Sequence, residues 1–211
     1  ASWTDLQDQL RNWFYYQRYS GDIIVEQTIH SIDFMSWMLN DKLPKTVSGT
    51  GGRQSKPWTE FGNVYDHFAI EFDYGDGLKG FHFGRQQNGT QNRNSVEAIG
   101  TKGNLQVGML SSYVINGQNP WKFQGKMNNM YQTQHDELFA AIRNKQVIND
   151  GDTMADSTML AIWAREAAYT GKAISLDEIM NSTKTYGPNS EGYDWAMEID
   201  NARIPRPGHT S

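Results

Sequence analysis

The amino-acid sequence predicts an α+β fold, in which a predominantly antiparallel, open sheet carries helices packed on one face. Hydrophobic residues recur every three or four positions near the start of the 211-residue chain, alternate with polar residues in the middle, and return to helical spacing afterwards. Strands that follow one another through tight turns pair antiparallel, and helices that flank them in sequence bury their apolar stripes against the sheet.

Two amphipathic helices are expected before residue 40. In the first, over residues 3–16, Thr4 is a suitable N-cap and apolar side chains follow at helical spacing. These side chains are Leu6, Leu10, Trp13 and Phe14. A break at 20–22 precedes the second helix, which should run without interruption from about Ile23 to Leu39 and end before Pro44.

The middle of the chain predicts a series of short strands. Alternation is clearest over residues 64–74, where every second residue from Phe68 to Tyr74 is a large apolar one. The glycine-rich turn at 75–77 then joins this strand to the next as a hairpin. The expected strands cover residues 46–54, 64–74, 78–86, 95–100, 104–107 and 113–115.

Helical spacing returns over residues 130–144 and 153–169, and a short helical turn fits 176–180. We expect residues 1–181 to form one α+β domain. Residues 182–211 are rich in Gly, Pro, Asn and Ser, and they should form an arm that packs on this domain, because aromatic residues remain among them. The aromatic residues of this arm are Tyr186, Tyr193 and Trp195.

The composition argues against several classes of protein. The net charge is −5 and the calculated pI is about 5.5, whereas general nucleic-acid binding requires a basic face. The chain has no cysteine, which excludes disulfides, thiolate metal sites and a cysteine nucleophile. Its apolar runs are too short for a membrane-spanning helix. We therefore expect a globular domain that binds neither nucleic acid nor a membrane.

The sequence opens with Ala1-Ser2-Trp3 and enters a helical pattern almost at once, without a signal peptide, so we interpret it as part of a longer protein. It does not decide between a cytoplasmic and a periplasmic location. The glycine-rich stretches lie in expected hairpins, and neither a P-loop nor a Gly-x-Gly-x-x-Gly turn leads from a strand into a helix. By itself the chain should therefore not bind a nucleotide pyrophosphate.

Three polar residues of the second predicted helix carry the most chemical information. Glu26, His30 and Asp33 are four and three residues apart, which places them within about 60° of one another on a continuous helix. Large apolar residues border this stripe, and this indicates a cleft or another domain rather than solvent. A histidine between two carboxylates in such a position can act as a general acid or base.

Two other interpretations of the same three residues remain open from spacing alone. A core histidine can simply be paired with a neighbouring acid, and a histidine and a glutamate one turn apart can share a zinc ion. No second histidine motif supports a zinc site, so no metal is expected.

The segment from Gly21 to Asp33, GDIIVEQTIHSID, closely resembles the start of the C-terminal domain in the glucose–fructose oxidoreductase/inositol dehydrogenase/MocA-like (Gfo/Idh/MocA) family. The resemblance continues in order along nearly the whole chain, to about residue 180. It includes the strand that ends GGRQ at 51–54, GNVYDHF at 62–68, RQ at 85–86, IGTKG at 99–103, the helix over 134–142 and the end of the late helix, YTGK, at 169–172.

This resemblance implies a two-domain enzyme, in which an N-terminal Rossmann domain upstream of Ala1 binds NAD or NADP and supplies a catalytic lysine. The present chain would then be the substrate-binding and oligomerisation domain, and it would be inactive in isolation. His30 would be the acid/base on a sugar or polyol hydroxyl group. Glu26 would take the place of the family's usual aspartate. Asp33 would be a structural partner of His30 and Glu26 and not a catalytic residue. The open sheet face would join copies into a homo-oligomer.

Further residues near the stripe or at strand ends are candidates for substrate binding, because aromatic and basic side chains together suit sugar rings and their hydroxyl groups. These candidates are Tyr16, Arg18, Arg53, Asp66, His67 and Arg85. For each of them, core packing, solvent or a subunit interface is the alternative explanation. His82 lies between Gly80 and Gly84, which leave room for a closely packed partner and so suggest an interface.

We therefore expect the substrate-binding domain of an NAD(P)-dependent oxidoreductase that acts on a sugar, polyol or related hydroxyl compound. Two alternatives remain. One is a relative of the same fold that uses tightly held NAD to cleave a glycosidic bond, and the other is a non-catalytic module for carbohydrate binding or assembly. Net production of NAD(P)H would indicate the oxidoreductase, and sugar release without net NAD(P)H would indicate the glycoside-cleaving enzyme. Neither activity would indicate the non-catalytic module.

Overall fold

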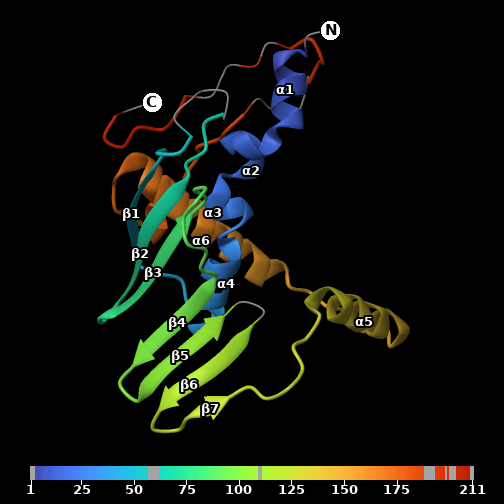
Figure 1. The fold of residues 1–211 in the computed structure, drawn as a ribbon. Coiled ribbons are helices and arrows are strands. Elements are labelled where there is room, and N and C mark those ends of the chain that lie inside the picture. The colour runs from blue at the N-terminus through green and yellow to red at the C-terminus, as the bar shows by residue number, and fades with distance from the viewer. Residues whose placement is uncertain are drawn as a thin grey trace. The chain divides into compact units, whose positions relative to one another are not determined.

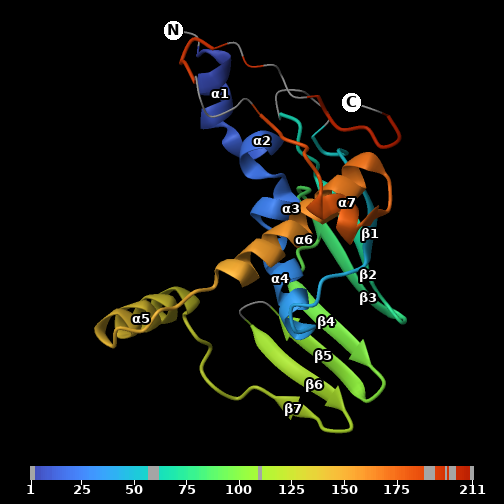
Figure 2. The same ribbon diagram turned by 180° about the vertical axis from the view of Figure 1, so that it is seen from behind.

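A computed structural model describes residues 3–56, 62–108, 111–187, 193–197, 199 and 203–209 of this protein. Its contacts divide the chain into two compact units. The first consists of Ala1–Thr90 together with Asp156–Ser211, and the second of Gln91–Ala155. Figures 1 and 2 show the helices and strands of both units.

The first unit begins with three short helical segments. Helix α1, Asp5–Arg11, starts at a capping box, in which the Thr4 hydroxyl accepts from the Gln7 N–H and the Gln7 side chain accepts from the Thr4 N–H. A 3₁₀ turn, η1 at Trp13–Tyr15, and helix α2, Gln17–Ser20, follow. Thr4 is thus confirmed as the N-cap, whereas the single helix predicted over 3–16 is shorter and continues as a 3₁₀ turn.

Helices α3, Ile23–Glu26, and α4, Ile29–Met38, take the place of the second predicted helix. Between them, the Thr28 N–H donates to the Ile23 carbonyl, five residues back instead of four. The prediction of one uninterrupted helix is therefore wrong at Gln27 and Thr28. Residues on either side of this break do not share the regular angular spacing that a single helix would give them.

Four antiparallel strands form the sheet of the first unit, in the order β3-β2-β1-β8. They are β1, Thr46–Gly52; β2, His67–Gly75; β3, Leu78–Arg85; and β8, Ile174–Ser175. The turn at 75–77 joins β2 to β3 in a hairpin, as predicted. Strand β8 was not predicted, because its two residues are too few to show a period.

One face of this sheet forms the core of the first unit. The apolar residues of β2, from Phe68 to Tyr74, are at most 3% exposed, which confirms the alternation seen in the sequence. Helix α6, Gly151–Thr170, buries Leu160 and Trp163 in the same cluster, together with residues of α3 and α4. Helix α7, Leu176–Met180, adds Ile179. The first unit is thus a sheet with its helices packed on one face, and its opposite face carries the exposed rings of β3.

The arm after α7 is held to α6 through a buried carboxylate. Tyr186 donates to both oxygens of Glu166, at 2.6 and 2.8 Å, and the Lys184 ammonium group lies 2.9 Å from the same side chain. Arg165 pairs with Glu166 at 2.9 Å and lies over the Tyr186 ring, 4.9 Å from its centre. This part of the arm therefore packs on the body through a charged cluster.

Two more contacts of the arm are made by its backbone. The Tyr65 hydroxyl donates to the Pro205 carbonyl at 3.0 Å, and the Thr4 hydroxyl donates to the Trp195 carbonyl at 2.6 Å. Tyr193 and Trp195 are 44% and 65% exposed, whereas the third aromatic residue of the arm, Tyr186, bonds to Glu166 on α6. The boundary at 181/182 remains a prediction.

The second unit contains a sheet of its own, in the order β4-β5-β6-β7, and one helix. Its elements are β4, Ser95–Gly100; β5, Gly103–Gly108; β6, Ser112–Gly117; β7, Trp121–Lys122; and α5, Met130–Arg143. All its strand pairs are antiparallel. The α+β fold class is confirmed, with the antiparallel strands divided between two sheets where the sequence predicts one.

Within the described ranges, no helix has both the length and the apolar character needed to cross a membrane.

Candidate functional site

The three residues predicted to share one helical stripe lie on two helices. Glu26 is the last residue of α3, and His30 is the second residue of α4. His30 is exposed and makes no hydrogen bond or ion pair with any residue in the part of the chain that the structure describes. Glu26 is half-buried, and its Oε2 is a buried atom without a hydrogen-bond partner among the described residues. The imidazole is therefore accessible to a ligand, and one carboxylate oxygen beside the break is still unpaired.

Asp33 is bound to the body of the first unit. Its Oδ1 accepts a hydrogen bond from the Ser157 hydroxyl on α6. This contact joins α4 to α6, so the structure gives Asp33 a structural partner.

The direction of α3 is set by a buried aspartate. Asp22 is fully buried and has φ 75° and ψ 165°, a conformation that is costly for residues other than glycine. Its Oδ1 accepts from the Ile23 N–H at 2.6 Å, and its Oδ2 accepts from the Tyr65 N–H at 2.7 Å and from the Tyr169 hydroxyl. Burial raises the pKa of Asp22 to about 6, although these hydrogen bonds act in the opposite direction. The strained residue is held in place by the segment before β2 and by α6 together.

Asp66 organises the edge of the sheet where β1 ends and β2 begins. Its side chain has no exposed surface. Oδ2 accepts from the backbone N–H groups of residues 54, 55 and 56, at 2.7, 2.6 and 3.2 Å. Oδ1 accepts from the Gln87 amide at 3.1 Å and lies 2.7 Å from His67 Nδ1. Burial alone would raise the pKa of Asp66, but the hydrogen bonds outweigh it and lower the pKa to about 2.

Because both oxygens of Asp66 are occupied by donors within the protein, the structure does not support its predicted contact with substrate. Arg53, another predicted substrate residue, is also engaged in this loop. Its guanidinium group donates to the carbonyl of Lys56 at 2.7 Å and to that of Gly62. The geometry assigns both residues to the shape of the loop after β1.

Lys56 extends from this loop towards two aromatic rings. Its ammonium group lies 5.8 Å from the centre of the Phe14 ring and 5.5 Å from that of Tyr15, and it donates to Gln86 Oε1 at 2.7 Å. The Gln86 amide nitrogen in turn donates to Gln27 Oε1 at 3.2 Å. A polar chain therefore leads from Lys56 to the break between α3 and α4, three residues before His30.

The sequence prediction did not include Lys56, Gln86 or Gln27 among the site residues. Two of them follow positions that it did single out, since β1 and β3 end at the same edge of an antiparallel sheet. Extending the search three residues beyond Arg53 and one residue beyond Arg85 would have found Lys56 and Gln86. Gln27 lies in the helix break and carries no comparable signal.

The remaining predicted substrate residues fall into two groups. Tyr16 is 7% exposed and donates to Asp8 Oδ2 at 3.1 Å; burial, with the charge of Asp8, raises its pKa to about 12. Arg18 is half-buried on α2. His67 and Arg85 are paired across β2 and β3 on the sheet face opposite the core. Tyr16 is thus a packed residue, whereas His67 and Arg85 lie on the open face.

His82 lies on the core side of β3, where the sequence suggests a subunit interface. It is 6% exposed, and burial lowers its pKa to about 4. A Cβ atom on Gly84 would lie 2.9 Å from His82 Nε2 and 3.3 Å from the Thr28 methyl group, and one on Gly80 would lie 2.4 Å from Met35 Sδ. The two glycines therefore make room for α4 of the same chain, and the interface interpretation is wrong.

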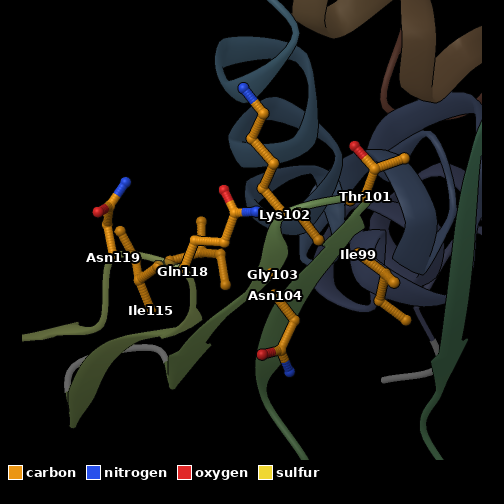
Figure 3. Close-up of a pocket in the computed structure, with 11 residues that line it drawn as sticks. Ile99, Thr101, Lys102, Gly103, Asn104, Ile115, Gln118 and Asn119 are labelled. Atoms are coloured by element: carbon orange, nitrogen blue, oxygen red, sulfur yellow. The ribbon is translucent and has the colours of Figure 1, made fainter.

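A shallow hollow of about 460 Å³ lies in the second unit, around the turn between β4 and β5. Figure 3 shows Thr101 and Lys102 extending from this turn on one side and Asn104 pointing to the other. Lys102 is the one charged residue of its lining, and no buried polar side chain points into it. No group of three or more His, Asp or Glu side chains in the described ranges could hold a metal ion. The polar chain of Lys56, Gln86 and Gln27, together with His30, is therefore the better candidate site.

Comparison with known proteins supports the resemblance seen in the sequence. The profile of the GFO/IDH/MocA C-terminal domain matches residues 1–106. No curated protein sequence matches the chain.

Several solved structures share its fold. An aldose-aldose oxidoreductase from Caulobacter crescentus, complexed with glycerol, is 16% identical with a TM-score of 0.63, over 78% of this chain and 50% of that one. GenD2 from gentamicin A biosynthesis, in complex with NAD, is 17% identical with a TM-score of 0.61, over 78% and 51%. A putative myo-inositol dehydrogenase from Sinorhizobium meliloti is 21% identical with a TM-score of 0.55, over 76% and 52%.

The chain therefore spans about half the length of the structures that it resembles. These likenesses establish the fold, and the profile match over half of the chain establishes its family. The protein belongs to the GFO/IDH/MocA family, and this chain carries the C-terminal domain of that family.

Proposed function

We propose that this chain is the substrate-binding domain of an NAD(P)-dependent oxidoreductase that acts on a sugar, polyol or related hydroxyl compound. The observation that carries the proposal is the position of His30, an exposed imidazole directly after the break between α3 and α4. Glu26, whose buried Oε2 has no hydrogen-bond partner among the described residues, lies on the other side of the same break. The names of the structural relatives, an aldose-aldose oxidoreductase among them, support the substrate class.

Oxidation of an alcohol removes a proton from the hydroxyl group and a hydride from the carbon that bears it. In this proposal the neutral imidazole of His30 accepts the hydroxyl proton. In this proposal the Glu26 carboxylate accepts a hydrogen bond from the substrate, because its Oε2 has no partner among the described residues. Asp33 fixes α4 through Ser157 and so limits the movement of His30.

A nicotinamide cofactor, when bound, supplies the hydride acceptor. The residues described here do not form the cradle for its pyrophosphate. Gly75–Gly80 has the Gly-x-Gly-x-x-Gly spacing, but it joins β2 to β3, whereas a dinucleotide-binding turn leads from a strand into a helix. We therefore place the cofactor-binding residues upstream of Ala1, in the Rossmann domain that the resemblance implies.

The test is the rate of NAD(P)H formation by the full-length natural protein with a panel of sugars and polyols. His30→Ala should lower kcat/KM by roughly 100- to 10,000-fold, the usual loss of a general base. His135→Ala, which removes an exposed histidine from α5, is the matched control and should leave the rate unchanged. Sugar release without net NAD(P)H would favour the glycoside-cleaving alternative. No effect of His30→Ala on any activity would contradict the proposal.

We also propose that the open face of the first sheet joins copies of this chain. Phe81 and Phe83 on this face are 56% and 76% exposed, and large exposed rings on a sheet face are typical of an interface. Phe83→Asp should lower the mass measured by sedimentation equilibrium to that of the monomer. Leu78→Asp, at the distal hairpin end of the same strand, is the control. An unchanged assembly in Phe83→Asp would contradict this part of the proposal.

A further inference from the structure

The corner formed by η1, residues 53–56 after β1 and the end of β3 contains a cation, Lys56, that has no counter-ion among the residues that the structure describes. The Lys56 ammonium group has three N–H donors, and one of them bonds to a neutral amide oxygen, that of Gln86. Its other close neighbours are the faces of two aromatic rings. Lys56 forms no ion pair with a carboxylate in the ranges that the structure covers.

The nearest carboxylates are not free to neutralise this charge. Asp66 Oδ2 accepts from three backbone N–H groups and the Ser55 hydroxyl, and its Oδ1 accepts from the Gln87 amide. Asp22 is fully buried and accepts three hydrogen bonds. Burial lowers the pKa of Lys56, while Asp22 and Asp66 act against this effect and Arg53 adds to it. A half-buried ammonium group in such surroundings gains more from an added anion than an exposed one would.

The aromatic side of the corner is held rigidly. The Asn63 N–H donates to the Tyr15 carbonyl at 3.0 Å, and Asn63 Oδ1 accepts from the Gln17 N–H at 2.8 Å. A Cβ atom on Gly62, which has φ 60°, would lie only 1.9 Å from the Tyr15 carbonyl oxygen, so this close approach requires glycine. The Phe14 and Tyr15 rings meet edge to face, with centres 5.7 Å apart. This rigid pair can stack on a sugar ring without losing side-chain freedom.

The corner is connected to the candidate catalytic residue. Gln86 bonds to Lys56 through its oxygen and to Gln27 through its nitrogen, so its amide orientation is fixed at both ends. Gln27 lies in the break between α3 and α4 and precedes His30 by three residues. One polar chain therefore joins the corner to the segment that carries the imidazole.

From these observations we infer that Lys56 binds the anionic group of a negatively charged carbohydrate, a carboxylate or a phosphate, whose ring packs on Phe14 and Tyr15. This inference rests on the proposed oxidoreductase function and narrows its substrate class. A neutral polyol would bring no negative charge to pair with the Lys56 ammonium group. An anion bonded to the two remaining N–H donors would neutralise it.

The experiment compares matched anionic and neutral ligands. Calorimetry on the full-length protein compares the binding of glucuronate with glucose, galacturonate with galactose, and glucose 6-phosphate with glucose. NAD(P)H formation measures the oxidation of the same compounds. The first two pairs test a carboxylate and the third a phosphate. We expect one class of anion to bind roughly 10- to 100-fold more tightly than its neutral counterpart, the usual strength of a charged hydrogen bond.

Three variants separate charge from structure. Lys56→Gln should abolish the preference for the anion while changing the affinity for the neutral ligand by less than about threefold. Lys56→Arg should retain much of the preference, because it keeps the charge. Lys42→Gln, which removes an exposed lysine beyond the end of α4, should behave as the natural protein.

The possible results distinguish this inference from the proposed function. The inference would be overturned if the protein bound the anionic and the neutral ligand of every pair with equal affinity. It would also be overturned if Lys56→Gln lost the same affinity for both ligands of a pair. Both conclusions hold whether or not sugars are oxidised. A preference that depends on Lys56 in the absence of NAD(P)-linked oxidation would support the anion site and contradict the oxidoreductase proposal.

Discussion

The Tyr169 hydroxyl on α6 donates a hydrogen bond to Asp22 Oδ2, on the residue that opens α3. Asp22 also accepts from the Tyr65 N–H, so α6 and the segment that leads into β2 hold the same carboxylate. This contact orients α3 from within the core, and the break that follows presents His30 on the exposed side. The geometry of the candidate site therefore depends on a buried hydrogen bond that does not itself touch a ligand.

Tyr169→Phe should destabilise the protein by about 1.5–3 kcal/mol, because it removes a hydrogen bond to a buried charge. The measurement is the free energy of unfolding in urea at pH 7. Tyr74→Phe is the matched control, since the Tyr74 side chain is also fully buried while its hydroxyl has no partner among the described residues. It should change stability by less than about 0.5 kcal/mol. Equal losses in the two variants would contradict the role given to Tyr169.

The parts of the fold that the sequence reveals are those with a regular period. The apolar positions from Phe68 to Tyr74 and the turn at 75–77 fix a hairpin by local chemistry alone, and the structure confirms both. The break at Gln27 and Thr28 has no such signal, because neither proline nor glycine occurs between Ile23 and Leu39. Thr28 packs beside His82 and Gly84, so the break reflects a tertiary contact that no local pattern contains.

The candidate site shows the same division. The exposed His30 is found from its spacing and from the family resemblance, whereas the spacing of Asp66 and Arg53 beside strand ends suggests exposed polar residues. In the structure their charges are satisfied within the loop after β1. Whether a polar side chain binds a ligand or shapes a loop depends on where the backbone N–H and C=O groups point, and the sequence does not record this.

Asp66→Asn should destabilise the loop after β1, because the amide NH₂ group would face N–H donors where a carboxylate oxygen now accepts. We expect a loss of roughly 2 kcal/mol at pH 7, measured by thermal unfolding. The pKa of Asp66 is lowered to about 2 from an ordinary value near 3.8, so its contribution is present above pH 4 and is lost as the pH falls towards 2.

The natural protein and Asp66→Asn should therefore become similar in stability at low pH. Asp76→Asn, in the exposed turn of the β2–β3 hairpin, is the control and should be nearly neutral, because asparagine tolerates the positive φ of 55° found there. A constant difference between the natural protein and Asp66→Asn from pH 7 to pH 2 would count against the proposed role of Asp66.

His82 should make the stability of the protein depend on pH between about pH 6.5 and pH 4, above the range in which Asp66 acts. Burial lowers its pKa from an ordinary 6.5 to about 4, so the folded state favours the neutral ring. Its contribution is complete above pH 6.5 and is lost as the pH falls towards 4, by roughly 3 kcal/mol in total. The difference in unfolding free energy between the natural protein and His82→Leu, followed from pH 7 to pH 4, isolates this effect.

Asp22 titrates in the same range with the opposite sign, since its pKa is raised to about 6, but it is present in both proteins and cancels from the difference. A pH-independent difference would show that His82 is not held neutral.

The arm should detach when its charged cluster is weakened. Tyr186→Phe removes a donor to the buried Glu166 carboxylate, which burial makes costly to leave unpaired. We expect a loss of about 1–2 kcal/mol and faster tryptic cleavage after Lys184. Tyr193→Phe is the control, because that ring is 44% exposed. If both variants are cleaved at the natural rate, the hydrogen bond to Glu166 does not hold the arm.

Glu26→Gln tests how Glu26 contributes to the reaction. Glu26 Oε2 is a buried atom without a hydrogen-bond partner among the described residues, so a hydroxyl group of the substrate can donate to it. Loss of the negative charge weakens that hydrogen bond, and we expect kcat/KM to fall by roughly 10- to 100-fold. Glu26→Asp keeps the charge with a side chain one methylene shorter, and it should retain more of the activity than Glu26→Gln. If Glu26→Gln keeps the natural kcat/KM, the reaction does not use the charge of Glu26, and the carboxylate matters only through its packing at the end of α3.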